Sequence, residues 1–383
     1  MDNSENSTPP RLETPPPQPP PLMSSLRPPA PRRRVGSWVV ILLVCCLAAF
    51  GLVGLFAFKL NRSFSSLLKG ETGSAHSGGP RLEEVTVESD ETENKIVVIP
   101  VEGIIMSEAL DRGFSMVEMI EEQLKRAADD DHVKAVILKV DSPGGEVLAS
   151  DDINHLLADF QEQNDIPVIA SMGSLAASGG YYVSAPCQWI VANKLTLTGS
   201  IGVIMSTLNY RGLMDKVGVR PEVFKSGRFK DMLRGSKSES EITQEERDMI
   251  QALINDAYGE FKNVVAEGRK KANDKNKHED EPGQALVKNW EQYADGRVLT
   301  GREAFKIGLV DELGNFDAAV ESAKRLADIE KANLVKYHEV FDLASLFRLF
   351  GKSQTPAIKV DLGLETPRVK PGRMYYLMPT FAY

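Results

Sequence analysis

Histidine and cysteine are scarce in this 383-residue chain, which has five of the first and three of the second. Cys45 and Cys46 fall in one apolar run, so Cys187 has no partner for an internal disulfide in the rest of the chain. No cysteine–histidine cluster has zinc-ligand spacing, and we predict no metal and no other cofactor. An excess of positive charge is also lacking: the formal net charge is −9, which argues against nucleic-acid binding.

Charge is absent altogether from one long stretch near the N-terminus. Residues 35–58 contain no charged side chain, and a helix of this length crosses a hydrocarbon core of about 30 Å. The stretch is too long and too far from Met1 for a cleavable signal peptide. Three arginines precede it, and only Lys59 and Arg62 follow closely. We therefore predict one transmembrane helix with its N-terminal side in the cytoplasm.

The segments around this helix differ in composition. Residues 1–34 are rich in Pro, Ser and Arg, which predicts a disordered cytoplasmic tail. Residues 59–94 are rich in Ser, Gly and Glu and read as a flexible tether. A folded domain is expected over 95–330. The remaining residues, 331–383, form a C-terminal extension in which 374–378 is unusually apolar.

Apolar strands and amphipathic helices alternate within the predicted domain. This pattern predicts an α/β fold with a mostly parallel sheet flanked by helices. The longest helix is expected to begin at Thr243-x-x-Glu246, which has the form of a capping box. The charged run 269–281 is expected to be a solvated loop or insertion. The strands are expected at 96–101, 133–140, 168–172 and 189–192, and two shorter helices at 115–128 and around 153–160.

Three glycine-rich turns follow predicted strands, at 141–145, 176–180 and 198–202. The carboxyl ends of parallel strands meet at one edge of a sheet, so these turns should face one crevice. Glycine lets backbone N–H groups approach a ligand closely, and two such groups stabilise the oxyanion of an acyl-transfer reaction. The pattern alone is equally typical of close helix–sheet packing.

Ser178 lies in the second turn, between small residues, where a hydroxyl would be presented at a strand-to-helix junction. A serine nucleophile needs a base. A Ser-His-Asp arrangement that uses His155 stays open, although nothing near it in the sequence supports it. Lys230 is the other candidate, since apolar neighbours and Arg228 would lower the pKa of its amine.

Five collinear motifs decide between these interpretations, because together they resemble the signal peptide peptidase SppA family over about residues 95–325. The motifs are Lys-Val-Asp-Ser-Pro-Gly-Gly (139–145), Ala-Ala-Ser-Gly-Gly-Tyr-Tyr (176–182), Thr-Gly-Ser-Ile-Gly-Val (198–203), Lys-Ser-Gly-Arg-Phe-Lys-Asp (225–231) and the stretch 294–314 that ends in Gly-Leu-Val-Asp-Glu-Leu-Gly.

The resemblance implies a crotonase-like fold, shared with the Clp protease subunit, and a Ser–Lys dyad. Matched residue by residue, Ser178 is the nucleophile and Lys230 the general base. Ser200 matches the serine that orients the lysine. Gly145 and Gly179 match the donors of the oxyanion hole.

The family's activity implies a serine endopeptidase that cleaves signal peptides left in the membrane, here with its catalytic domain outside the cytoplasm of a bacterium. The chain holds one catalytic copy, as the short members of the family do. In those members Ser and Lys meet between subunits of a ring, commonly an octamer. We also expect the apolar tail at 374–383 to occupy the active-site groove of its own chain or of a neighbour.

Three alternatives have the same general features. An NfeD-type protease would use the same chemistry on specific membrane proteins, but the N-terminal anchor favours SppA. A crotonase-fold acyl-CoA enzyme would also use two oxyanion N–H donors, yet an extracytoplasmic domain meets no coenzyme A. An inactive membrane scaffold is the third alternative.

Overall fold

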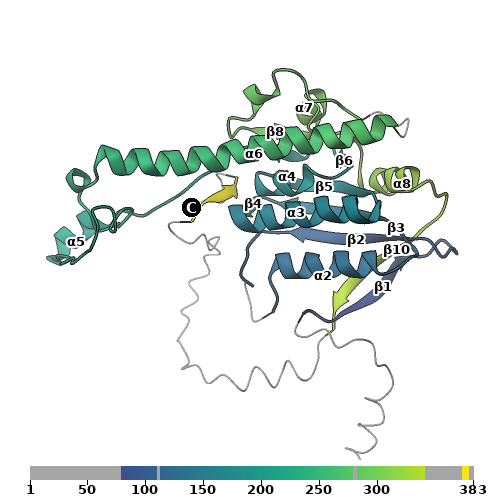
Figure 1. Cartoon of the computed structure of the whole chain (residues 1–383), viewed down its shortest axis with the longest axis horizontal. Helices are drawn as coiled ribbons and strands as arrows, with labels where there is room; N and C mark the ends of the chain where they lie inside the picture. Colours follow the sequence, from purple (N-terminus) through teal and green to yellow (C-terminus); the bar gives the residue numbers. More distant parts are fainter. Residues whose placement is uncertain (1–78, 110–112, 279–282, 341–372, 379–383) are drawn as a thin grey trace, which may run out of the picture. The chain divides into compact units, whose positions relative to one another are not determined.

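Strands dominate the centre of the described chain and helices cover them (Figure 1). The computed structural model describes residues 79–109, 113–278, 283–340 and 373–378. Its elements, in chain order, are β1 (Leu82–Glu88), β2 (Lys95–Glu102), α2 (Met116–Ala128), β3 (Val133–Ser142), β4 (Gly144–Glu146), α3 (Val147–Asn164), β5 (Val168–Ala177), α4 (Gly179–Ser184), β6 (Trp189–Ala192), β7 (Leu197–Gly199), α5 (Arg211–Val217), η1 (Glu239–Glu241), α6 (Gln244–His278), η2 (Trp290–Tyr293), β8 (Val298–Thr300), α7 (Gly301–Lys306), β9 (Glu312–Leu313), α8 (Phe316–Leu326), β10 (Asn333–Glu339) and β11 (Tyr375–Leu377).

Within the described residues, nine strands form one sheet in the order β1-β10-β2-β3-β5-β6-β9, with β7 beside β5 and β8 beside β7. The central pairs are parallel, and only β1 with β10 and β7 with β8 are antiparallel. The predicted mixed α/β class with a mostly parallel sheet is thus confirmed. Its finer assignment to the crotonase and Clp group stays a prediction.

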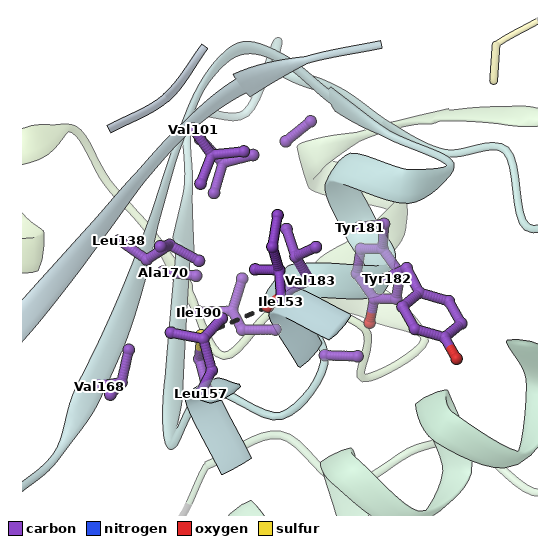
Figure 2. Close-up of a cluster of buried hydrophobic side chains, with 14 of the residues drawn as sticks. Val101, Leu138, Ile153, Leu157, Val168, Ala170, Tyr181, Tyr182, Val183 and Ile190 are labelled. Atoms are coloured by element: carbon purple, nitrogen blue, oxygen red, sulfur yellow. Dashed lines mark hydrogen bonds between the residues drawn. The ribbon is translucent and has the colours of Figure 1, made fainter. Parts of the chain in front are cut away.

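Side chains alternate between the two faces of the sheet, as the two-residue period of a strand requires. In β3, Val136 and Leu138 point to the larger core and Ala135 and Ile137 to the smaller one. Helix α8 covers the smaller core, whereas α2, α3 and α4 cover the larger. Figure 2 shows side chains of β2, β3 and β5 meeting those of α3 and α4 in the larger core. This packing fixes α4 against the carboxyl ends of the strands.

Helix α6 is longer than predicted and corrects one expectation. The charged run 269–281, predicted to be a loop, is helical as far as His278. Its polar side chains are bonded to the body of the domain: Arg269 donates to the Cys187 carbonyl and pairs with Asp311, and Asn276 donates to the Gln188 carbonyl. These bonds hold the run against the body of the domain, while Arg269 Nε and Asn276 Oδ1 are buried without a hydrogen-bond partner among the described residues. The run is thus buried on one side without the apolar periodicity that predicts a packed helix.

The N-terminal half of α6 leaves the body of the domain. Phe261 and Val265 are fully buried, whereas Met249 and Leu253 are 40% and 47% exposed. The predicted capping box is present, because Glu246 N–H donates to Thr243 Oγ1 and Thr243 N–H donates to the Glu246 carboxylate. The N-terminal half of α6 thus extends beyond the sheet and its covering helices, and α5 lies near this end of α6 (Figure 1).

The sheet extends past both predicted limits of the domain. Strand β1 lies in the predicted tether of residues 59–94, and β10 lies in the predicted extension of residues 331–383. The two strands pair with each other, and β10 also pairs with β2. Strand β1 is an edge strand that is exposed after its first residue, and β10 lies between β1 and β2 with buried and exposed positions mixed, so neither shows the continuous apolar run of a central strand.

The predicted tail and transmembrane helix, residues 1–34 and 35–58, lie outside the described residues. Within the described ranges, no helix combines the length and the apolarity needed to cross a membrane.

Candidate active site

Ser178 lies between the end of β5 and the start of α4, in a backbone conformation that non-glycine residues rarely adopt. Its φ and ψ are 53° and −117°, which costs on the order of 1–3 kcal/mol. The glycines after it allow the turn: a methyl group on Gly180 would lie 2.8 Å from the Ser142 carbonyl oxygen, and one on Gly179 would lie 2.6 Å from Ser150 Oγ. A strained serine between a strand and a helix is the geometry of a nucleophile elbow.

The two tyrosines after this turn hold α4 in place. The Tyr181 hydroxyl donates to the Leu309 carbonyl at 2.8 Å, and the Tyr182 hydroxyl donates to Asp151 Oδ1 at 2.6 Å. Both side chains belong to the larger core (Figure 2). The strain at Ser178 is thus maintained by contacts of α4 with helix α3 and with the segment between α7 and β9.

The hydroxyl of Ser178 is fully buried and has no hydrogen-bond partner among the described residues. A buried hydroxyl without a partner costs about 1–3 kcal/mol, and such groups are rare enough to need a reason. His155, the candidate for a Ser-His-Asp arrangement, is exposed on α3 and lies 3.6 Å from Asp151. It does not contact Ser178. Among the described residues, no candidate base therefore forms a hydrogen bond with the Ser178 hydroxyl.

Gly145 and Gly179 lie on two sides of one small space beside Ser178. A methyl group on Gly144 would come within 2.6 Å of the Gly179 nitrogen, and one on Gly179 within 3.0 Å of the Gly145 nitrogen. The φ of Gly144 is +102°, which favours glycine. Ser142 stabilises the turn, because its Oγ accepts from Gly144 N–H at 3.1 Å and donates to the Gly103 carbonyl at 2.6 Å. This arrangement brings two backbone nitrogens to one side of the serine.

Ser200 lies next to Ser178 because of the register between β5 and β7. Ala177 is paired with Gly199, and Ser178 N–H donates to the Gly199 carbonyl at 2.8 Å. Each serine therefore follows the last residue of its strand on neighbouring parallel strands. Ser200 is 3% exposed, has a φ of 51°, and donates its N–H to the Arg297 carbonyl at 2.8 Å.

Lys230 is the one predicted site residue that the structure does not bring to the others. It lies in a turn of the segment 205–243, here called the arm, which also contains α5 and η1. Lys230 is exposed, and its ammonium makes no hydrogen bond or ion pair with the described residues. In Figure 1, α5 lies near the N-terminal end of α6, whereas α4 lies beside the middle of that helix, where Tyr182 contacts Phe261.

A second lysine of the arm, Lys237, differs from Lys230 in being buried and paired with carboxylates. Lys237 is 5% exposed and pairs with Glu246 at 2.6 Å and with Asp231 at 3.3 Å. Burial opposes its charge, but the hydrogen bonds to these two carboxylates raise the pKa of Lys237 above its ordinary value. A lysine held in its protonated form cannot act as a base at neutral pH. Lys237 therefore stabilises the arm on α6.

The arm also exposes several large apolar side chains. Phe224 is 89% exposed and Leu208 is 77% exposed. The exposed apolar residues of the arm and of the adjoining start of α6 are Leu208, Tyr210, Leu213, Val217, Val219, Val223, Phe224, Leu233, Met249 and Leu253.

The C-terminal segment of the chain lies across the predicted oxyanion turn. Strand β11 pairs antiparallel with β4, so that Tyr376 is opposite Gly145. On its other side, Tyr375 exchanges both backbone hydrogen bonds with Ile204 at 3.0 Å. Residues 375–377 of the apolar tail therefore lie between β4 and Ile204 of the same chain, in a position here called the groove. That this groove is the active-site groove stays a prediction. Residues 379–383 lie outside the described part.

The side chains of β11 are buried on both faces of the strand. The Tyr376 ring stacks on Tyr182 with centroids 4.8 Å apart and contacts Phe261 at 4.6 Å, and its hydroxyl donates to the Ala257 carbonyl at 2.9 Å. Tyr375 and Leu377 pack together on the other face, with Ile104 and Ile204 partly buried against them. The groove therefore accepts an extended apolar segment, with one aromatic pocket.

The family model for peptidase family S49 matches residues 160–330. A signal peptide peptidase SppA of Enterococcus faecium is 38% identical over 68% of this chain and 72% of its own length. A protease of Synechocystis is 37% identical over 71% of this chain and 89% of its own length.

The chain belongs to the signal peptide peptidase SppA family. It is therefore a serine protease of peptidase family S49. Protease 4 of Haemophilus influenzae, also similar, is 35% identical over 61% of this chain but only 35% of its own length, so the SppA-type chain described here spans about a third of that relative.

Reasoning from the sequence missed the walls of the groove. Glu146, Tyr182, Ile204 and Phe261 all contact β11. Tyr182 was visible only as part of a motif, and Phe261 only as part of an amphipathic helix. Glu146 offered one usable signal, because an acidic residue directly after a buried Gly-Gly turn is unusual for a packed strand end.

Proposed function

We propose that this SppA-family protease is anchored in a bacterial inner membrane by residues 35–58, with its catalytic domain outside the cytoplasm, and hydrolyses signal-peptide remnants and other membrane-associated peptides. Ser178 is the nucleophile and Lys230 of a neighbouring copy is the general base. The proposal is carried by two observations that complement each other. The buried hydroxyl of Ser178 has no hydrogen-bond partner among the described residues, and Lys230 lies on an exposed arm with apolar side chains.

The arm supports association between copies of the chain. Burying its apolar residues on a second copy would stabilise the contact by roughly 25 cal/mol per Å². The same contact would bring Lys230 from water to a buried place beside Ser178, and desolvation lowers the pKa of a lysine. A contact between different surfaces of identical chains repeats head to tail and closes into a ring, for which the family resemblance suggests an octamer.

With Lys230 of a neighbouring copy beside Ser178, the proposed reaction is an acyl transfer. Neutral Lys230 Nζ removes the proton from Ser178 Oγ, and the oxygen attacks the peptide carbonyl carbon to form a tetrahedral oxyanion. The N–H groups of Gly145 and Gly179 stabilise that oxyanion. The lysine returns the proton to the leaving amine, and water, activated by the same lysine, hydrolyses the acyl-enzyme. The hydroxyl of Ser200 accepts a hydrogen bond that orients Lys230.

The binding mode of the substrate is suggested by β11. An extended peptide that adds to the edge of β4 gains main-chain hydrogen bonds whatever its sequence, and its side chains fill the pockets on alternate faces. Such a peptide takes the place of β11, with the residue opposite Gly145 as the acyl group. A remnant of a membrane-spanning signal sequence is apolar and, once extracted, extended, which suits this groove.

The proposal is tested by measuring cleavage of a fluorogenic apolar peptide by the full-length chain in detergent micelles. Wild type should turn the peptide over, whereas Ser178→Ala and Lys230→Ala should each lose activity by at least about 1000-fold. Both variants should elute at the same size as wild type. Equal turnover in all three proteins would refute the assignment of the dyad.

A further inference from the structure

A pair of carboxylates lies beside the oxyanion turn and holds a cation of the tail. Glu146, the last residue of β4, accepts a hydrogen bond from Arg373 Nη1, and Glu108 accepts one from Arg373 Nη2 at 3.0 Å. The Glu146 side chain is 5% exposed, whereas that of Glu108 is 54% exposed. Glu146 is thus buried within the groove, and Glu108 lies at its exposed edge.

Glu146 is held in place independently of the tail. Ser107 donates both its N–H, at 3.0 Å, and its hydroxyl, at 2.5 Å, to Glu146 Oε2. The other oxygen, Oε1, accepts from Arg373. Burial opposes the charge of this carboxylate, yet the hydrogen bonds from Ser107 and the guanidinium keep the pKa of Glu146 below its ordinary value. An ionised buried acid needs a cationic partner, because an uncompensated charge in this position is costly.

The register of β11 places this cation relative to the reacting bond. The backbone N–H and C=O of Tyr375 both bond to Ile204, so those of Tyr376 face the opposite side, toward Gly145. A methyl group on Gly144 would lie 2.0 Å from the Tyr376 carbonyl oxygen and 2.6 Å from the Gly179 nitrogen. Tyr376 therefore stands where the acyl residue of a substrate would lie, and Arg373 is three residues before it.

We propose that Glu146 and Glu108 form a subsite for a basic side chain three residues before the acyl residue, which is the fourth residue before the cleaved bond. The inference rests on the proposed function, since it treats β11 as occupying the place of a substrate. The preferred substrate is then an extended peptide in which one Arg or Lys precedes a short apolar or aromatic stretch. Arginine suits the subsite better than lysine, because its planar fork reaches two carboxylates at once.

The test compares two quenched fluorogenic peptides, Arg-Met-Tyr-Tyr-Leu-Met and Gln-Met-Tyr-Tyr-Leu-Met. The full-length enzyme carries Arg373→Ala, so that its own tail no longer competes for the two carboxylates. The kcat/KM for the Arg peptide should exceed that for the Gln peptide by about tenfold, which is the range of charge-assisted hydrogen bonds. Adding Glu146→Gln should reduce this ratio below about threefold.

Glu108→Arg provides a second variant at an exposed position, in case Glu146→Gln fails to fold. It should also reduce the ratio, and should favour a peptide with Glu in place of Arg. Glu102→Gln is the matched control, because Glu102 is an exposed acid near the end of β2 whose side chain pairs with Lys139. Its ratio should equal that of the parent enzyme.

Binding separates failure of this inference from failure of the proposed function. Anisotropy of the same labelled peptides on Ser178→Ala, Arg373→Ala enzyme reports recognition without cleavage, and the Arg peptide should bind about tenfold more tightly. If neither peptide is cleaved but this preference holds, the subsite stands and the catalytic proposal fails. Equal binding and equal kcat/KM for both peptides, or a ratio that survives both Glu substitutions, would overturn the subsite.

Discussion

Tyr376→Ala should release the C-terminal strand from the groove and raise activity toward added peptides. The Tyr376 side chain is 1% exposed, stacks on Tyr182, contacts Phe261 and donates a hydrogen bond to Ala257. Losing the burial of such a side chain costs about 1.5–3 kcal/mol, the aromatic pairing about 0.5–1.5 kcal/mol, and the hydrogen bond about 0.5–1.5 kcal/mol. These terms overlap, so about 3 kcal/mol is a reasonable total.

A loss of this size weakens docking of the strand by roughly 100-fold. If β11 occupies the groove in most molecules, kcat/KM toward a fluorogenic peptide should rise by as much as this factor. The accompanying structural measurement is hydrogen exchange at the amides of residues 375–377, which should lose protection in the variant. Tyr376→Phe keeps the ring and removes only the hydroxyl, so its effect should be at most about tenfold.

The result that would refute this reasoning is an unchanged kcat/KM together with unchanged protection of β11. A fall in activity would refute it as well, since the strand would then be supporting the site and not competing with substrate. Thermal unfolding of the variant should stay close to wild type, because among the described residues the backbone of β11 pairs with the short strand β4 and with Ile204 alone.

Three further predictions follow from individual contacts. Gly144→Ala should reduce kcat/KM at least about 100-fold with little change in secondary structure, because a methyl group cannot be placed at a φ of +102° in this crowded turn. Arg269→Met should lower the free energy of unfolding by about 3–5 kcal/mol in chemical denaturation, since it leaves Asp311 buried without its partner. The lowered pKa of Glu146 means that its pairing with Arg373 stabilises the docked strand above pH 4.5 and loses this contribution as the pH falls further, so the difference in hydrogen exchange between wild type and Arg373→Ala should vanish in acid.

Those parts of the site that depend on local sequence could be predicted. The glycines around Ser178 and the turn before Gly145 are needed for the backbone itself, so the motifs indicated both the turns and their position at strand ends. The shared register of β5 and β7 then follows from a parallel sheet, and it accounts for the proximity of Ser178 and Ser200.

The remaining features depend on contacts between distant residues. Arg269 and its neighbours read as a solvated loop, because their partners at 187, 188 and 311 are invisible from local sequence. Strand β1 is an edge strand, and β10 lies between it and β2. Their pairing joins residues about 250 positions apart, so their partly polar pattern resembled a tether and a tail. The proposed pairing of Lys230 with Ser178 of a neighbouring copy is a contact between chains, and no pattern within one chain specifies such a contact.

The most direct test of the central claim is complementation between two inactive chains. Ser178→Ala and Lys230→Ala proteins are mixed in equal amounts, dissociated, reassembled, and assayed on one fluorogenic peptide. If the dyad forms between neighbouring copies, random assembly leaves about a quarter of the sites with both an intact serine and an intact lysine, so activity should recover to about 25% of wild type. Activity no higher than that of either variant alone, in mixed oligomers shown to contain both chains, would contradict the account.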